Sequence, residues 1–163
     1  MIVCGTGHRP EKIGGYSYSA FRKLVDFAKP HLENHNPDEV ISGTALGWDM
    51  VLLVAGLELG MNVHAAIPFN TFGSQWGLET KRWWNDYIEQ CSTVTIVTDL
   101  DDEPKRFEVL NALNTRNKFM VDKSNRVMAL WNGTSGGTAN TVHYAESVRR
   151  TVDNYWYFWE RYG

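Results

Sequence analysis

The chain has 163 residues, of which 43% are hydrophobic and 13% aromatic, so it can bury a sizeable core, and its length fits one domain better than two. Its formal net charge of −3 argues against a broad electrostatic footprint for duplex nucleic acid or an anionic membrane. We therefore expect a single domain over residues 1–163 that binds a small molecule or a protein partner.

The cysteines and the N-terminal sequence indicate a cytoplasmic protein. Cys4 and Cys91 lack CxxC spacing, so both are expected to be reduced thiols. The N-terminus has no basic region followed by a long apolar run, and no segment offers the ~18 uninterrupted apolar residues of a membrane span. Neither a signal peptide nor a membrane helix is expected.

Short apolar strands alternate with helices along the chain. Strands are expected at residues 1–5, 39–42, 62–67, 93–98 and 126–131. Apolar residues at helical spacing predict helices within residues 18–32, 49–59, 76–91, 107–121 and 138–152. The fourth helix is expected to bury Phe107 and Leu110, and the last helix to bury Val152. Five strands that are apolar enough to be covered on both faces predict an α/β fold, namely a doubly wound, mainly parallel five-stranded Rossmann-like sheet with helices on both faces.

Three loops that follow predicted strands carry the residues suited to ligand binding. They read TGHRP at 6–10, SGTALGWD at 42–49 and SGGTANT at 135–141. In a doubly wound sheet, ligands bind beyond the carboxyl ends of the strands, near the switch in strand order. The third loop runs straight into a helix, whose unpaired N–H groups and dipole favour a phosphate. The alternative is an ordinary turn that uses Gly136 and Gly137 for backbone freedom.

With Pro68-Phe69, Trp76 and the stretch 116–131, these motifs resemble the YpsA-like branch of the SLOG superfamily. The Rossmann-like domains of that superfamily include the Lonely Guy phosphoribohydrolases and the DprA core. The resemblance runs from Met1 to about Ala145. It implies a pocket for a nucleotide or a nucleotide-derived molecule in a sensor- or carrier-type module, with no cofactor required.

The resemblance and the loop chemistry together assign roles to individual residues. Residues 135–138 would hold a phosphate with backbone and hydroxyl donors, and Arg9 could pair with it bidentately. Asp49 could accept from ribose hydroxyls, or could be a first-turn acid that complements the helix dipole. The pocket is expected to be lined by Thr6, Gly7, His8, Arg9, Gly43, Thr44, Gly47, Asp49, Phe69, Trp76, Arg116, Asn117, Ser135, Gly136, Gly137, Thr138 and Thr141.

Several of these residues have an alternative structural role. His8 could donate to a phosphate or stack on a base, or it could bond neighbouring carbonyls in a turn. Arg116 could reach the pocket, whereas Asn117 could bind ligand or brace the loops. Phe69 and Trp76 could flank a base or simply belong to the core.

An enzymatic reading remains open beside the binding one, namely an N-glycosidase of the nucleoside 5′-monophosphate phosphoribohydrolase type. The Lonely Guy motif is PGGxGTxxE, and Thr141 stands where that motif has its glutamate. Such chemistry needs a carboxylate near the anomeric carbon. Asp49 is the candidate for this role, with Glu79 and Glu108 as further possibilities. Single-stranded DNA binding, as in DprA, has less support because the basic residues are scattered.

Two remaining features are expected to have structural roles. His31 and His35 lie four residues apart on a predicted helix, but no third ligand is near in sequence, so no metal site is expected. The aromatic tail, residues 153–163, is expected to pack on the fold or to form a homodimer interface.

Overall fold

Six parallel strands form one sheet in the order β4-β3-β2-β1-β5-β6 in the computed structural model, which describes residues 1–163. The strands are β1 (Ile2–Gly7), β2 (Glu39–Ser42), β3 (Asn62–Phe69), β4 (Thr93–Thr98), β5 (Arg126–Leu130) and β6 (Thr151–Asn154). The helices are α1 (Tyr18–His35), α2 (Trp48–Glu58), α3 (Leu78–Glu89), α4 (Arg106–Lys123), α5 (Gly137–Ser147) and α6 (Trp156–Glu160), with a short 3-10 helix η1 (Pro10–Lys12). The predicted α/β class and Rossmann-like architecture are confirmed.

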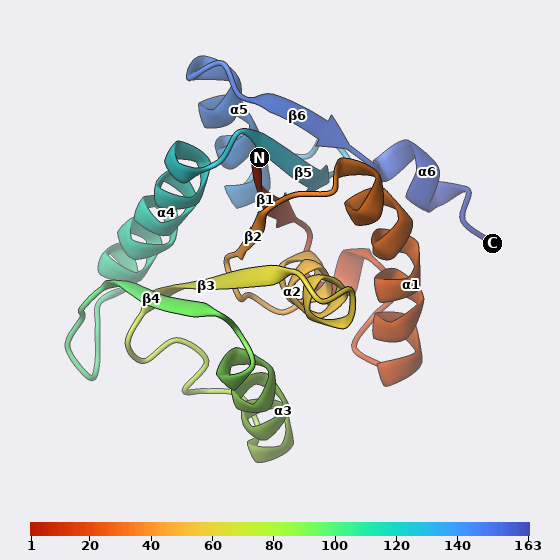
Figure 1. The fold of residues 1–163 in the computed structure, drawn as a ribbon. Coiled ribbons are helices and arrows are strands. Elements are labelled where there is room, and N and C mark those ends of the chain that lie inside the picture. Colours follow the sequence, from red (N-terminus) through yellow and green to blue (C-terminus); the bar gives the residue numbers. More distant parts are fainter.

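The helices cover both faces of the sheet (Figure 1). On one face α2 packs on β1, β2 and β3, and α1 packs against α2. The opposite face is covered by α4 and α5. Every residue from Trp48 to Gly56 in α2 is buried, because this helix packs on the sheet and against α1, and residues of α3 join the same buried cluster.

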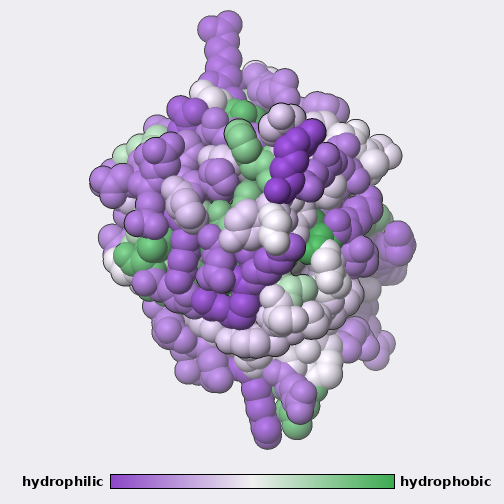
Figure 2. Space-filling model, turned by 90° about the vertical axis from the view of Figure 1, so that its right-hand side faces the viewer, coloured by the Kyte–Doolittle hydropathy of each residue, from purple (hydrophilic) through white to green (hydrophobic).

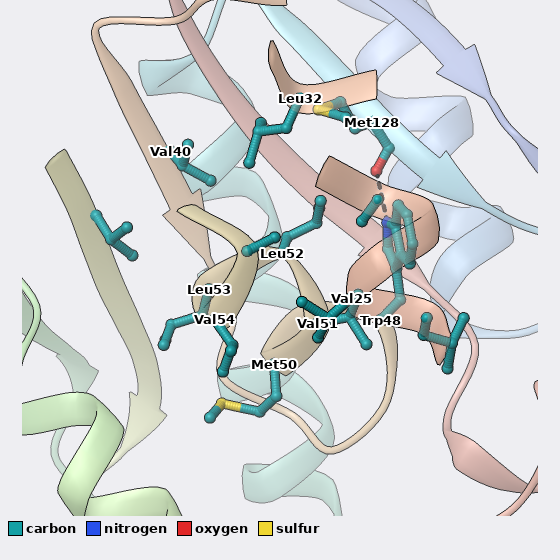
Figure 3. Packing of buried hydrophobic residues seen from close by; sticks show 14 of the residues in the cluster. Val25, Leu32, Val40, Trp48, Met50, Val51, Leu52, Leu53, Val54 and Met128 are labelled. Atoms are coloured by element: carbon teal, nitrogen blue, oxygen red, sulfur yellow. Dashed lines mark hydrogen bonds between the residues drawn. The ribbon is translucent and has the colours of Figure 1, made fainter. Parts of the chain in front are cut away.

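The core centred on α2 also satisfies its polar groups. The Trp48 indole is fully buried, and its Nε1–H donates to the Met128 carbonyl oxygen at 3.0 Å (Figure 3). Leu52 and Leu53 are buried in the same cluster as Val40 of β2 and Val25 of α1 (Figure 3). Burying a side chain of this size stabilises the fold by about 1.5–3 kcal/mol.

The sheet has six strands, so the prediction of five strands was wrong. The predicted end of the last helix, at residue 152, was also wrong. Helix α5 ends at Ser147, and Arg149 then adopts a left-handed conformation with φ 63°. The chain returns to the sheet as β6, where Val152 pairs with Val127 of β5. Val152 continues the helical spacing of the preceding residues, which is why it was placed on the helix.

The predicted burial of Phe107 and Leu110 was also wrong. Their exposed fractions are 61% and 51%. Helix α4 faces the sheet with Ala112, Arg116 and Met120 instead. Because α4 follows a parallel strand and runs back along the sheet, its first turns lie at the carboxyl edge, where the sheet no longer covers them.

The aromatic tail packs on the fold. Tyr155 is buried and its hydroxyl group bonds His35 Nε2 at 2.7 Å. The Trp159 and Tyr162 rings lie 5.3 and 5.2 Å from Phe27 of α1. The surface on the α1 and α6 side is mainly hydrophilic, with hydrophobic side chains in small separate groups (Figure 2). No helix is long and apolar enough to cross a membrane.

Candidate functional site

The strand order reverses at β1, which has β2 on one side and β5 on the other. A cavity of about 370 Å³ lies where β1 and β5 end. It is lined by Thr6, Gly7, His8, Arg9, Glu11, Lys12, Ala45, Asp49, Leu110, Leu113, Arg116, Asn117, Thr134, Ser135, Gly136, Gly137 and Thr138. The switch-point position expected from the fold class is thus occupied by a cavity, which we call the basic cavity.

The amino terminus of α5 opens into the basic cavity without a cap. Gly136 precedes the helix with φ 141°, a conformation that favours glycine, and no side chain caps the helix. The N–H groups of Gly137, Thr138 and Ala139 have no acceptor within the chain. Together with the helix dipole, these free donors favour an anion at this end of the cavity.

Basic side chains surround the same space. Arg9 is exposed at the end of β1, and Arg116 is buried on α4. Lys12 reaches across from η1, and its Nζ donates to Thr134 Oγ1 at 3.3 Å. Three cations from three different elements therefore line one cavity in a chain whose net charge is −3.

The glycine-containing loop at residues 42–49 uses its backbone donors for hydrogen bonds within the protein. At the start of α2, the Trp48 N–H donates to the His8 carbonyl at 3.2 Å, and the Met50 N–H donates to the Ala45 carbonyl at 3.2 Å. Gly47 has φ 99°, and a Cβ there would lie 2.5 Å from the His8 carbonyl oxygen. Gly47 thus allows the loop after β1 to approach the start of α2 closely. The start of α2 is bonded to this loop, whereas the start of α5 is uncapped and open to the cavity.

Asp49 and Arg116 both line the cavity, and both side chains approach Gly43. A Cβ on Gly43 would lie 2.6 Å from an Arg116 guanidinium nitrogen and 2.8 Å from Asp49 Oδ2, so glycine is required there. Asp49 Oδ2 accepts from the Ala45 N–H at 3.3 Å, and Arg116 donates to the Gly43 carbonyl. Arg116 Nε also donates to Asn117 Oδ1 at 2.8 Å.

Burial dominates the electrostatics of this pair. It raises the pKa of Asp49, against the opposing effects of the Arg116 charge and the Ala45 N–H. Burial also lowers the pKa of Arg116, while the Asp49 carboxylate opposes that shift. An incoming ligand thus meets a carboxylate that accepts hydrogen bonds and is costly to keep charged.

His8 is buried and supports the loop after β5. Its Nε2 accepts the Asn132 N–H at 2.9 Å, and its ring lies edge-on to Trp156 at 5.5 Å. Burial is the largest cause of its lowered pKa; the Asn132 side chain opposes this shift and the Lys12 charge adds to it. A neutral ring with Nε2 as acceptor fits this environment.

Other predicted site residues lie outside the lining of the cavity. Gly43 lies beneath it, and Gly47 faces the loop after β1. Thr44 is fully buried with φ 67°, and Thr141 Oγ1 donates to the Gly137 carbonyl of its own helix at 2.9 Å. Phe69 and Trp76 pack with Phe72 and Trp84 in an aromatic cluster beside α3.

Several lining residues were not predicted. Lys12 and Glu11 lie in the loop that contains Arg9, but only the η1 turn brings them over the cavity. Thr134 belongs to the same glycine-containing turn as Ser135, so this position was readable from the sequence. Leu110 carried no signal, because its hydrophobicity indicated a core position.

A family model described as the YspA SLOG family matches residues 3–158. The uncharacterized SPbeta prophage-derived protein YoqJ of Bacillus subtilis (strain 168) is 24% identical over 137 residues, which cover 77% of this chain and 80% of YoqJ.

Two solved structures share the fold. DNA processing protein A (DprA) from Streptococcus pneumoniae has a TM-score of 0.66 at 21% identity, covering 92% of this chain and 48% of that one. The Moco carrier protein from Chlamydomonas reinhardtii has a TM-score of 0.52 at 16% identity, covering 93% and 73%. This chain spans about half the length of that DprA, and at these identities the likeness shows the fold alone. Because the family model covers nearly the whole chain, this protein belongs to the YpsA family of the SLOG superfamily.

Proposed function

We propose that the protein binds a nucleotide or nucleotide-derived molecule in the basic cavity. One observation carries this proposal. The uncapped amino terminus of α5 lines the same cavity as Arg9, Lys12 and Arg116, at the switch point of the sheet. A phosphate satisfies the free N–H groups and the side-chain cations at once. In this proposal the protein acts as a sensor or carrier of that ligand.

Another part of the cavity lining suits the sugar of such a ligand. Asp49 is the buried carboxylate there, and a carboxylate accepts hydrogen bonds from ribose hydroxyls. Asn117 Oδ1 is already held by Arg116 Nε, which leaves its amide N–H groups to donate. The ligand would therefore bind through its phosphate at α5 and through its sugar near Asp49.

The positions of the candidate catalytic carboxylates favour binding over hydrolysis. Thr141 replaces the glutamate of the Lonely Guy motif and its hydroxyl is bonded to its own helix. Glu108 caps α4, since its Oε1 accepts the Lys105 N–H at 3.0 Å. Glu79 lines a different cavity, beside α1 and α3. Asp49 alone of the candidates lines the basic cavity.

The test is a thermal-shift and calorimetric panel of nucleoside monophosphates, NAD and ADP-ribose. Ligands that bind raise the melting temperature by mass action. Arg9→Ala removes an exposed cation and should weaken binding at least about tenfold without loss of stability, since charge-assisted hydrogen bonds contribute about 1.5–3 kcal/mol. Arg106→Ala, at an exposed position outside the cavity, is the matched control. No shift with any ligand at millimolar concentration would contradict the proposal.

The hydrolase remains a second candidate because Asp49 is a buried carboxylate with a raised pKa inside the basic cavity. Chromatography of the same incubations for free base separates the two functions. Steady base release that disappears in Asp49→Ala would establish the enzyme in place of the binder.

A further inference from the structure

A second cavity, of about 380 Å³, lies between the first turns of α1 and the first turns of α3. Tyr16, Tyr18, Phe21 and Trp83 contribute aromatic rings to it, and Phe21 meets Trp83 edge-on at 5.0 Å. Its lining contains no lysine, arginine or histidine. We call it the aromatic cavity.

The two cavities share a ridge of backbone. Arg9 and Ala45 line the basic cavity, while their neighbours Pro10 and Leu46 line the aromatic one. Consecutive Cα atoms are about 3.8 Å apart, so the partition is narrow. At its edge, the Tyr16 hydroxyl donates to Glu11 Oε2 at 2.7 Å, which links the two linings directly.

The basic cavity offers no free surface on which a base could stack. His8 is its sole aromatic-type side chain, and that ring is held by Asn132 and Trp156. Planar heterocycles bind by stacking on aromatic rings, each worth about 1–3 kcal/mol. The rings that could provide this lie across the ridge.

Glu79 is the charged side chain in the lining of the aromatic cavity, and it determines which ligand groups can bind there. Glu79, in the first turn of α3, lines the cavity and has neither a hydrogen bond nor an ion pair to another side chain. An ionised carboxylate accepts and cannot donate. It therefore suits a ring edge that presents N–H donors, and two adjacent donors satisfy both of its oxygens.

We propose that the aromatic cavity is the base subsite of the ligand and that Glu79 selects a purine with adjacent N–H donors, of the guanine type. This inference rests on the proposed function, because the phosphate held at α5 is what places the base across the ridge. Guanine presents N1–H and an exocyclic amino group side by side, whereas hypoxanthine lacks the amino group.

Calorimetry with ribose 5-phosphate, GMP and IMP tests the assignment. Wild-type protein should bind GMP about tenfold more tightly than IMP, because GMP adds one hydrogen bond to a charged group. Glu79→Gln should abolish that preference, and Tyr18→Ala should weaken both nucleotides about fivefold or more. Neither variant should change the affinity for ribose 5-phosphate. Glu89→Gln, at the exposed end of the same helix, is the matched control.

Each remaining outcome decides a different point. If GMP and IMP bind equally to wild type, or if Glu79→Gln and Tyr18→Ala bind nucleotides like wild type, the base subsite is overturned while the proposed function stands. If wild type binds neither ribose 5-phosphate nor any nucleotide, the proposed function fails and the base subsite fails with it.

Discussion

At the scale of single residues, the site depends on positions that hold the loops together more than on those that would touch a ligand. Gly47 allows the start of α2 to meet the carbonyl of His8, and His8 in turn accepts a hydrogen bond from the loop after β5. The sequence indicated that these positions matter, because glycine and histidine follow predicted strands. Their partners could not be predicted, since they come from loops distant in the chain.

Gly47→Ala should destabilise the protein by at least about 3 kcal/mol, since the new Cβ meets the His8 carbonyl oxygen in addition to the positive φ. Gly60→Ala is the matched control: Gly60 has φ 74° but no atom lies within 4 Å of its Cβ position, so only about 1 kcal/mol is expected. Urea unfolding of both variants checks the difference. Equal losses would mean that the contact with the loop after β1 is not made.

His8 should stay neutral in the folded protein at pH values where an exposed histidine is protonated. Its folded pKa lies below the unfolded value of 6.5, so its contribution to stability is complete above pH 6.5 and is lost as pH falls through the folded pKa. NMR titration of the ring resonance, assigned with His8→Gln, measures this directly. A titration midpoint at or above 6.5 would contradict the buried, acceptor role of Nε2.

At the scale of elements, α1 is fastened to α2 by charge as well as by packing. Glu58 of α2 accepts from Arg22 at 2.5 and 3.0 Å, and its other partner, Lys29 Nζ, lies 2.6 Å away. The hydrogen bonds from Arg22 are the main reason that the pKa of Glu58 falls to about 2. The helices themselves were predictable from their spacing, whereas this pairing of their outer faces was not.

Glu58→Gln should cost about 1 kcal/mol at neutral pH, a value reduced by solvent screening at a partly exposed site. A depressed carboxyl pKa stabilises the fold above pH 4.5, and this stabilisation is lost as pH falls through about 2. The gap between wild type and variant, measured by urea unfolding, should therefore narrow between pH 4.5 and 2 and should also narrow in high salt. A gap independent of pH would exclude the ion pair as its cause.

At the scale of the whole molecule, the fold class and the presence of a cavity at the switch point were predictable because both follow from local sequence patterns. An apolar strand or a glycine-rich loop can be recognised from a few consecutive residues of the sequence. Strand β6 was missed because TVDN is short and three of its four residues are polar, and because its pairing depends on β5 being in place. Phe69 and Trp76 were ambiguous for a similar reason, since an aromatic residue faces a cavity or a core only once its neighbours are positioned.

The tail supplies the molecular-scale prediction. Trp159→Ala should lower the free energy of unfolding by about 2 kcal/mol, because its half-buried ring packs against Phe27 within the same chain. Tyr157→Ala, 60% exposed, should cost less than about 0.5 kcal/mol. The Trp159 loss should be the same at low and high protein concentration in urea titrations. A loss that depends on concentration would instead indicate that the tail stabilises a dimer.

The burial of α2 on all sides has a consequence for how the chain behaves before it is folded. Apart from Asp49, the segment from Trp48 to Gly56 is apolar on every side, so it has no extended polar face to present to water. During synthesis it leaves the ribosome before β3 and β5 exist to cover it. Until those strands arrive, this segment is uncovered, and transiently exposed apolar surface of this kind promotes aggregation.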